Sequence, residues 1–294
     1  MHETSDGLPP LRQVIAEHGL SAKKSLGQNF LLDFNLTRKI ARAAGPLEGC
    51  TIYEIGPGPG GLTRALLAEG AARVIAVERD QRCIAALEEI AHAFPGRLEI
   101  VPTDAMELEE IKFLRERNIS SPVRVAANLP YNVGTALLVK WLTASEWPPF
   151  WNSLTLMFQR EVAERLVGRP GSSEFGRLSV LAQWRTEPRI LFDVDRRAFT
   201  PSPGVTSTLL RIEPLAEPRA PARLEDLERI TAAAFGQRRK MLRQSLKRLA
   251  PDAETLIRSA GIDPESRPQD LAILQFAALA RAFSPSPPLR GGEG

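Results

Sequence analysis

Several features that mark specialised classes of protein are scarce in this chain of 294 residues. It has two cysteines, Cys50 and Cys83, and no metal-ligand spacing. We interpret them as small buried residues in a reducing cytoplasm, not as a disulfide or a metal site. No run is long and apolar enough to span a bilayer, so we expect no membrane protein. The first ten residues are polar and carry acids, so we expect no secretory signal.

Net charge is also small, at +3, but the pI is about 9.1 and the basic residues are clustered. The densest cluster, in residues 237–248, contains no acid. A basic helix face is often only solvated surface, yet a cluster of this kind favours nucleic-acid binding. The candidate nucleic-acid contacts are Arg238, Arg239, Lys240, Arg243, Lys247 and Arg248.

From residue 51 onward, short apolar runs alternate with helical patterns. Such alternation predicts an α/β fold with a mostly parallel sheet covered on both faces. The expected strands are 51–55, 74–77, 98–101, 123–127 and 154–158, and the expected helices between and after them are 62–69, 81–93, 135–142 and 161–167.

The regions on either side of this pattern differ from it. Asp33 is positioned to cap a helix over 34–44. After residue 176 we expect a helix at 179–186, strands at 190–194 and 208–212, and a proline-rich loop at 199–204. Helices are predicted at 224–235, 238–249, 253–259 and 270–282. The resulting domains are an arm (1–20), an α/β domain (21–215), an all-α domain (216–283) and a disordered tail (284–294).

Residues 128–131, Asn-Leu-Pro-Tyr, directly follow the expected strand 123–127. Pro130 cannot continue a central strand, so the chain turns at the carboxyl edge of the sheet, where such folds bind ligands. The Asn128 amide oxygen and the Leu129 carbonyl can accept both hydrogens of an exocyclic amine, and Tyr131 offers a ring for stacking. Asn-x-Pro is also ordinary turn chemistry, so the motif alone leaves both interpretations open.

Residues 56–61, Gly-Pro-Gly-Pro-Gly-Gly, join the first strand to its helix. Glycines there allow a ligand to approach the backbone. With Glu78 at the end of the second strand, they also fit a dinucleotide fingerprint, so a nicotinamide dehydrogenase is an alternative. Pro57 and Pro59, however, lack the amide hydrogens that would hold a pyrophosphate.

Acids stand at two successive strand ends, Glu78 and Asp104. A carboxylate accepts hydrogen bonds well, from ribose hydroxyls at Glu78 and from an adenine amine at Asp104. S-adenosylmethionine has both groups and no phosphate, so it suits the proline-containing loop. Either acid alone can be a surface group or a turn cap; their order along the chain favours this cofactor.

Taken together, these residues resemble the bacterial KsgA family of small-subunit rRNA adenine dimethyltransferases. The resemblance covers the chain from about residue 20 to about 283, without the arm and the tail. Gly204 departs from it, because the family often has lysine there. The segments that carry it are 24–31, 54–58, 78, 104–106, 128–132, 199–207 and 235–240.

The resemblance implies a Rossmann-like methyltransferase sheet of seven strands, the last antiparallel, with a small all-α C-terminal domain. It implies dimethylation of two adjacent adenosines near the 3′ end of small-subunit (16S) rRNA, with S-adenosylmethionine as cofactor. The implied cofactor contacts are Asn29, Leu31, Gly56, Glu78, Asp104 and Asn128. The expected catalytic residues are Asn128, Leu129, Pro130, Tyr131 and Phe199, with Tyr131 and Phe199 on either side of a flipped base.

The expected partner is small-subunit rRNA within a pre-ribosomal small subunit, bound by a cytoplasmic monomer that needs no metal. Two further alternatives remain open. One is a methyltransferase of the same fold that acts on large-subunit rRNA. The other is a ribosome-assembly or transcription factor that keeps the fold without the chemistry; the intact 128–131 motif argues against it.

Overall fold

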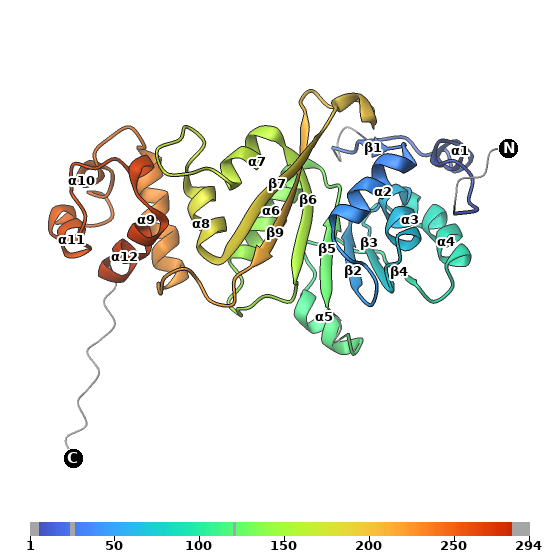
Figure 1. Ribbon diagram of the computed structural model, residues 1–294, viewed down its shortest axis with the longest axis horizontal. Coiled ribbons are helices and arrows are strands. Elements are labelled where there is room, and N and C mark those ends of the chain that lie inside the picture. The colour runs from blue at the N-terminus through green and yellow to red at the C-terminus, as the bar shows by residue number, and fades with distance from the viewer. Residues whose placement is uncertain (1–5, 24–26, 120–121, 284–294) are drawn as a thin grey trace, which may run out of the picture. The chain divides into compact units, whose positions relative to one another are not determined.

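The computed structural model describes residues 6–23, 27–119 and 122–283 (Figure 1). The predicted disordered tail, 284–294, lies outside the described residues. The chain folds into two compact units. The first unit is Met1–Ala163 with Arg189–Pro214, and the second is Glu164–Pro188 with Leu215–Gly294. The domain boundaries expected from the sequence differ from these and stay a prediction.

The sheet has seven strands in the order β4-β3-β2-β5-β6-β9-β7 (Figure 1). The pairs formed by β2, β3, β4, β5 and β6 are parallel, and β9 runs antiparallel to β6. The prediction of seven strands with the last one antiparallel is confirmed. Their bounds are β2 Thr51–Ile55, β3 Arg73–Val77, β4 Leu98–Val101, β5 Val123–Ala127, β6 Ser153–Gln159, β7 Thr186–Val194 and β9 Ser207–Pro214.

Burial along the central strands explains why their sequences are continuous apolar runs. Every residue of β2 is buried, and so are six of the seven residues of β6. Successive side chains of a strand point to opposite faces of the sheet, so both faces must be covered. Because these strands are parallel, their carboxyl ends meet at one edge of the sheet. The loops that follow the strands can form a site at this edge.

Six helices belong to the described part of the first unit before β6: α1 Leu11–Glu17, α2 Phe34–Ala43, α3 Gly61–Ala68, α4 Ile84–Ala93, α5 Glu110–Glu116 and α6 Tyr131–Leu142. Asp33 caps α2 as predicted, accepting from the amides of Asn35 and Leu36. The α5 helix was not expected. The α6 helix starts four residues earlier than predicted, because the Pro130 carbonyl accepts the amides of Val133 and Gly134.

Two strands of two residues each form a separate small sheet. β1 (Phe30–Leu31) pairs antiparallel with β8 (Phe199–Thr200), with Leu31 opposite Phe199. The sequence predicted only a loop at 199–204, so this pairing corrects that expectation at its first two residues. It brings two segments that are far apart in the sequence to one place beside the main sheet.

The second unit is helical, with α8 Arg177–Arg185, α9 Leu224–Gly236, α10 Leu242–Ser245, α11 Ala253–Ser259 and α12 Ile273–Phe283; α7 (Arg160–Leu166) crosses the boundary between the units. The core of the second unit contains Trp184 from α8, Ile230 from α9 and Phe276 from α12. Phe276 and Phe235 stack with ring centroids 5.3 Å apart. No helix in the described ranges is long and apolar enough to cross a membrane.

The predicted helix over 238–249 is wrong. Residues 237–239 form a turn, and within 238–249 only Leu242–Ser245 is α-helical. The amides of Leu242 and Arg243 donate to the carbonyls of Ser266 and Pro264, so a distant segment holds this stretch of backbone. The basic run also offers no acid at helical spacing to offset repulsion between its charges.

Candidate active site

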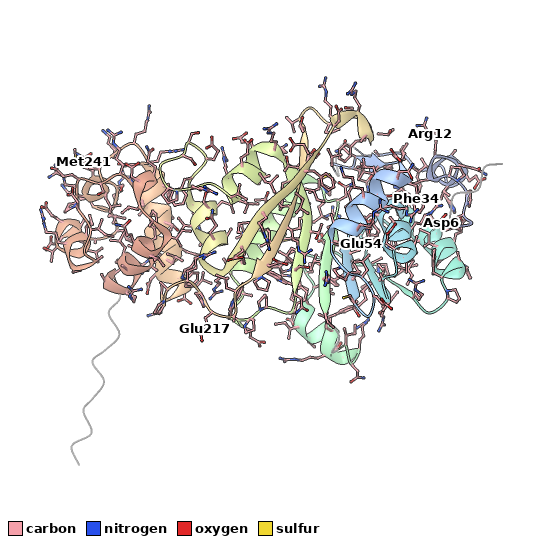
Figure 2. All side chains as sticks on the ribbon, viewed as in Figure 1. Asp6, Arg12, Phe34, Glu54, Glu217 and Met241 are labelled. Carbon is pink, nitrogen blue, oxygen red and sulfur yellow. The ribbon has the colours of Figure 1, made fainter. Side chains whose placement is uncertain are left out.

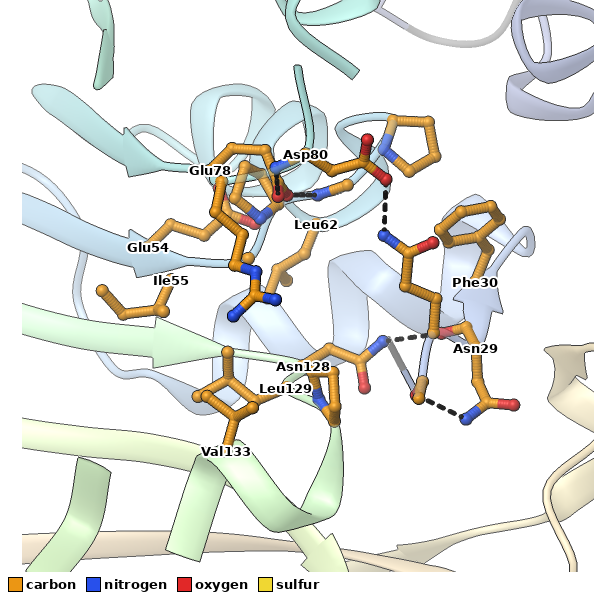
Figure 3. Close-up of a pocket in the computed structure, with 18 of the residues that line it drawn as sticks. Asn29, Phe30, Glu54, Ile55, Leu62, Glu78, Asp80, Asn128, Leu129 and Val133 are labelled. Atoms are coloured by element: carbon orange, nitrogen blue, oxygen red, sulfur yellow. Dashed lines mark hydrogen bonds between the residues drawn. The ribbon is translucent and has the colours of Figure 1, made fainter. Parts of the chain in front are cut away.

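A pocket lies at the carboxyl ends of β2, β3 and β5, within the first unit (Figure 3). It contains every residue that the sequence predicted for cofactor binding or catalysis. These are Asn29, Leu31, Gly56, Glu78, Asp104, Asn128, Leu129, Pro130, Tyr131 and Phe199. The fold therefore brings the predicted residues together, although their roles remain predictions.

The glycine loop after β2 forms one wall of the pocket. Gly56 has φ of 64°, and a Cβ there would lie 3.1 Å from Leu129 Cδ2, so glycine lets the two segments approach closely. Between residues 57 and 60 no backbone donor is free: both prolines lack one, Gly58 N–H donates to Glu78, and Gly60 N–H donates to the Pro57 carbonyl. A pyrophosphate would find no donors here, which argues against the dinucleotide alternative.

Glu78 sits at the end of β3 with its carboxylate turned to the loop (Figure 3). Its two oxygens accept hydrogen bonds from the amides of Gly58, at 2.8 Å, and Asp80, at 2.7 Å. Burial raises the pKa of Glu78, and these amide hydrogen bonds oppose the rise. Each carboxylate oxygen has a second lone pair, so Glu78 can still accept hydrogens from a ligand.

Asp104 follows β4 on the same edge of the sheet. Its Oδ1 accepts from the amide of Met106 and its Oδ2 from the Arg79 guanidinium, both at 2.9 Å. The Asp104 side chain is 29% exposed, so a ligand in the pocket can reach it. Arg79 is more exposed, at 56%, so its ion pair with Asp104 lies at the surface, where such pairs are weak.

Asn128, between β5 and α6, has an orientation set by its neighbour Asn29 (Figure 3). Its Nδ2 donates to the Asn29 carbonyl at 3.4 Å, while Asn29 Nδ2 donates to the Gly27 carbonyl at 3.2 Å. The nitrogen of Asn128 is thus turned to the β1 segment. Its oxygen then serves as the acceptor available to a ligand.

The two aromatic residues differ in how much of the ring a ligand can reach. Tyr131 is half-buried at the first position of α6, and its hydroxyl lies 2.8 Å from Ser207 Oγ. Phe199 borders the pocket but is only 5% exposed, and it packs in the same apolar cluster as Leu31. Its role in stacking therefore stays a prediction.

The site geometry agrees with what comparison with known proteins finds. The sequence pattern of the family described as ribosomal RNA adenine dimethylase matches residues 19–284. The chain belongs to this family. The predicted family, fold and enzyme class are thereby confirmed.

Relatives of this dimethylase are close in sequence and length. A protein from Ruegeria sp. (strain TM1040), named ribosomal RNA small subunit methyltransferase A, is 60% identical over 95% of this chain and 98% of its own length. A protein of the same name from Azorhizobium caulinodans is 60% identical over 98% of this chain and 96% of its own length.

Among solved structures, the 23S rRNA methyltransferase ErmE is similar with a TM-score of 0.65 and 28% identity, over 87% of this chain and 99% of its own. A dimethyladenosine transferase from Plasmodium falciparum has a TM-score of 0.66 at 22% identity, over 82% of this chain and 93% of its own. The second likeness supports the fold alone.

Two residues that line the pocket, Gln28 and Asp80, and the neighbouring Arg82 were not predicted as site residues. Gln28 donates to Asp80 at 3.0 Å and lines the pocket beside it. Hydrogen bonds from Arg82 lower the pKa of Asp80 to about 2, so it stays ionised. Together they attach the segment before β1 to the end of β3. Gln28 lies in a motif that carried the resemblance, but nothing in the sequence links it to residue 80.

The predicted RNA contacts of the dimethylase cluster around α10, in the second unit. Arg238 donates to the Ser173 carbonyl at 3.0 Å, and Arg243 lies 3.3 Å from a Glu265 oxygen. The other four are exposed: Arg239, Lys240, Lys247 and Arg248. In the described part of the chain, no group of three or more His, Cys, Asp or Glu side chains is arranged to hold a metal ion.

Proposed function

We propose that this chain dimethylates the exocyclic amines of two adjacent adenosines near the 3′ end of small-subunit (16S) rRNA, with S-adenosylmethionine as methyl donor. The family match and the 60% identity to proteins named small subunit methyltransferase A support the substrate. The observation that carries the chemistry is the orientation of Asn128, whose nitrogen is bound to Asn29 and whose oxygen is left to accept.

The pocket residues fit this cofactor. Glu78 suits the two ribose hydroxyls and Asp104 the adenine amine, because both retain acceptor capacity at neighbouring strand ends. The loop 57–60 has no free backbone amide, which does not weaken the binding of a cofactor without phosphates. Asn29 and Leu31 would hold it from β1, and Gly56 from the loop.

When bound, S-adenosylmethionine supplies a methyl group on a sulfonium, which is a strong electrophile. The adenine amine is a poor nucleophile because its lone pair is delocalised into the ring. Asn128 Oδ1 and the Leu129 carbonyl accept its two hydrogens, which favours a tetrahedral nitrogen and stabilises its growing positive charge. Pro130 holds the turn between these groups and Tyr131, whose ring stacks on the base.

The displaced proton becomes acidic only after transfer, so no strong base is required beforehand. After the first methylation one hydrogen remains on the amine, and the base must rotate within the pocket before the second. Phe199 is proposed for the far side of the base, reached when the flipped adenine enters beside β8.

RNA affinity is proposed to come from the basic residues around α10. The four exposed ones suit phosphate contacts, whereas Arg238 and Arg243 already have protein partners. We further propose a monomer that acts in the cytoplasm on a pre-ribosomal small subunit. The two free, buried cysteines suit a reducing compartment.

The experiment is methyl transfer from labelled cofactor to undermethylated small and large ribosomal subunits in parallel. We expect label only in the small subunit, as dimethyladenosine at two neighbouring positions by mass spectrometry. Label in the large subunit would favour the alternative suggested by the structural likeness to ErmE. Absence of label in both, with RNA still bound, would favour a non-catalytic assembly factor.

The Asn128→Ala variant tests the residue that carries the proposal. We expect cofactor and RNA binding to persist while kcat falls about a hundredfold or more, by analogy with the loss of one preorganised hydrogen-bond donor from an oxyanion hole. Asn35→Ala, at an exposed position of α2, is the matched control and should behave as wild type. Wild-type turnover by Asn128→Ala would show that the amine is not held there.

A further inference from the structure

The described part of the N-terminal arm, residues 6–20, lies almost wholly outside the segment that matches the family, 19–284, yet it packs against the rest of the first unit. The α1 helix and the residues after it contribute Val14 and Leu20 to a small apolar cluster with Cys83 and Ala86. Contacts with the start of α4 therefore hold the C-terminal half of the arm.

The beginning of the arm is held by a buried ion pair. The Arg64 guanidinium, on α3, donates through Nε and Nη2 to the two carboxylate oxygens of Asp6, both at 2.7 Å. The Asp6 side chain is 0% exposed and that of Arg64 is 3% exposed. Arg64 Nη1 also donates to the Pro9 carbonyl at 2.7 Å. A bidentate pair of this kind fixes orientation as well as position.

Between these two attachments lies Leu11, the first residue of α1. Leu11 is buried and lines the same pocket as Asn128 and Glu78. A Cβ at Gly61 would lie 2.8 Å from Leu11 Cδ2 and 2.9 Å from the Leu31 carbonyl, so arm, glycine loop and β1 meet there. Figure 2 labels Asp6 and Arg12, the residue after Leu11, on the right of the view, where Figure 1 shows α1, α3 and α4.

We infer that Asp6 and Arg64 are positioning residues for the cofactor site, and that Leu11 is the apolar wall which they hold in place. The inference rests on the proposed cofactor. Arg64 lies one turn after Gly61 on α3, so the pair ties the arm to the helix that the glycine loop begins. The arm then belongs to the binding site, closes one side of it and excludes water from it.

An arm that merely stabilises the fold would give a different result from one that forms a pocket wall. Asp6→Asn removes the carboxylate charge that faces the buried Arg64 guanidinium, so it should loosen the arm. Leu11→Ala instead removes side-chain area from the pocket and keeps both attachments. Leu11→Met restores the volume. Glu17→Gln is the matched control on the same arm, because the Glu17 side chain is exposed and its hydrogen bond from Gln13 lies at the surface.

The test is the dissociation constant of S-adenosylhomocysteine, measured calorimetrically for the full chain and these four variants. We expect about a tenfold weakening for Leu11→Ala and for Asp6→Asn, and wild-type binding for Leu11→Met and Glu17→Gln. The KM for the methyl donor should rise in step while kcat and the KM for RNA stay within about twofold. Trypsin should cleave after Arg12 faster in Asp6→Asn alone.

The inference is overturned if Leu11→Ala and Asp6→Asn bind S-adenosylhomocysteine like the wild type, whatever their melting temperatures, because the arm then serves the fold only. Leu11→Ala keeps both attachments, so it decides the matter even if Asp6→Asn does not fold. If the wild type itself does not bind S-adenosylhomocysteine, the proposed cofactor is wrong, and the inference that rests on it is wrong as well.

Discussion

The hydroxyl of Tyr131 lies 2.8 Å from the hydroxyl of Ser207, which is 76 residues later in the chain. Tyr131 is the first residue of α6, and Ser207 is the first residue of β9, where it is fully buried. Ser207 pairs with Gln159 across the sheet, so its position is fixed by the backbone ladder. The contact therefore ties the ring proposed to stack on the base to the central sheet.

Ser207→Ala should remove the hydrogen bond that orients the Tyr131 ring and leave the other residues of the pocket in place. One hydrogen bond contributes about 1 kcal/mol, so we expect kcat to fall about fivefold while cofactor binding is unchanged. Tyr131→Phe removes the same bond and should match it, and the double variant should be no worse than either single one. Steady-state methylation of small subunits measures this. Additive losses in the double variant would show that the two hydroxyls act independently.

Lys140 holds the loop after Asp104 against α6. Its Nζ donates to the Leu108 carbonyl at 2.7 Å, the Ala105 carbonyl at 3.2 Å and Glu110 Oε1 at 2.9 Å. Glu110 is buried and also accepts from Trp141 Nε1 at 2.8 Å. The segment that carries one proposed cofactor contact is thus attached to the helix that starts at Tyr131.

Lys140→Met keeps the aliphatic stem and removes these three hydrogen bonds. It leaves Glu110 without its cation, so we expect a loss of about 1–3 kcal/mol in the free energy of unfolding and weaker S-adenosylhomocysteine binding. Urea unfolding and calorimetry measure the two effects. Lys112→Met, at an exposed position of α5, is the control and should change neither. Unchanged ligand affinity in Lys140→Met would mean that the loop keeps its shape without this attachment.

The site residues could be predicted from the sequence because they directly follow strands, and the ends of these strands are clear from the apolar pattern. The apolar runs at 51–55, 98–101 and 123–127 match β2, β4 and β5 residue for residue. Glu78, Asp104 and the 128–131 motif follow such strands, and parallel strands deliver their carboxyl ends to one edge. Local pattern and topology therefore suffice to gather these groups in one pocket.

What escaped prediction depends on contacts between distant segments. The pairing of Leu31 with Phe199, and the ion pair between Asp6 and Arg64, have no local signature. The helix expected over 238–249 failed for a related reason, since distant carbonyls of Pro264 and Ser266 hold its backbone. Periodicity describes a face of a helix; it does not say whether tertiary hydrogen bonds will interrupt that helix.

Glu54 should make stability depend on pH. It is fully buried, and burial raises its pKa from 4.5 to about 8. The folded state then binds a proton that the unfolded state has released between about pH 4.5 and 8, so the free energy of unfolding falls as pH rises through this window. The slope from this group is at most about 1.4 kcal/mol per pH unit.

Glu54→Gln keeps the shape and removes the titration. We measure the melting temperature of this variant minus that of the wild type, both without ligand. We expect this difference to increase progressively from pH 5 to about pH 8 and then to stay constant. Glu48→Gln, at an exposed position, should show no such trend. A constant difference between Glu54→Gln and the wild type across this range would show that Glu54 does not titrate with a raised pKa.

Gly60 shapes the loop that leads into α3. Its φ is 87°, a conformation that side chains disfavour, and a Cβ would lie 2.1 Å from Ile90 Cδ1 on α4. Gly70 has the same kind of φ, 97°, but open space around it. We therefore expect Gly70→Ala to lower the free energy of unfolding by about 1 kcal/mol, from strain alone, and Gly60→Ala by about 3 kcal/mol.

The clash at Gly60 can be separated from the strain. Ile90→Val removes Cδ1. The contacts that remain at the Cβ position are Ile90 Cγ1 at 3.6 Å, an ordinary contact, and Leu87 Cδ2 at 3.3 Å, a side-chain end that has to move by only a few tenths of an ångström. The double variant Gly60→Ala/Ile90→Val should therefore be about as stable as Gly70→Ala combined with Ile90→Val, by urea unfolding. Because Gly58 in the same loop donates to Glu78, Gly60→Ala alone should also weaken S-adenosylhomocysteine binding, and the double variant should regain part of it. If Ile90→Val restores neither stability nor binding, the packing of α4 is not what requires glycine at this turn.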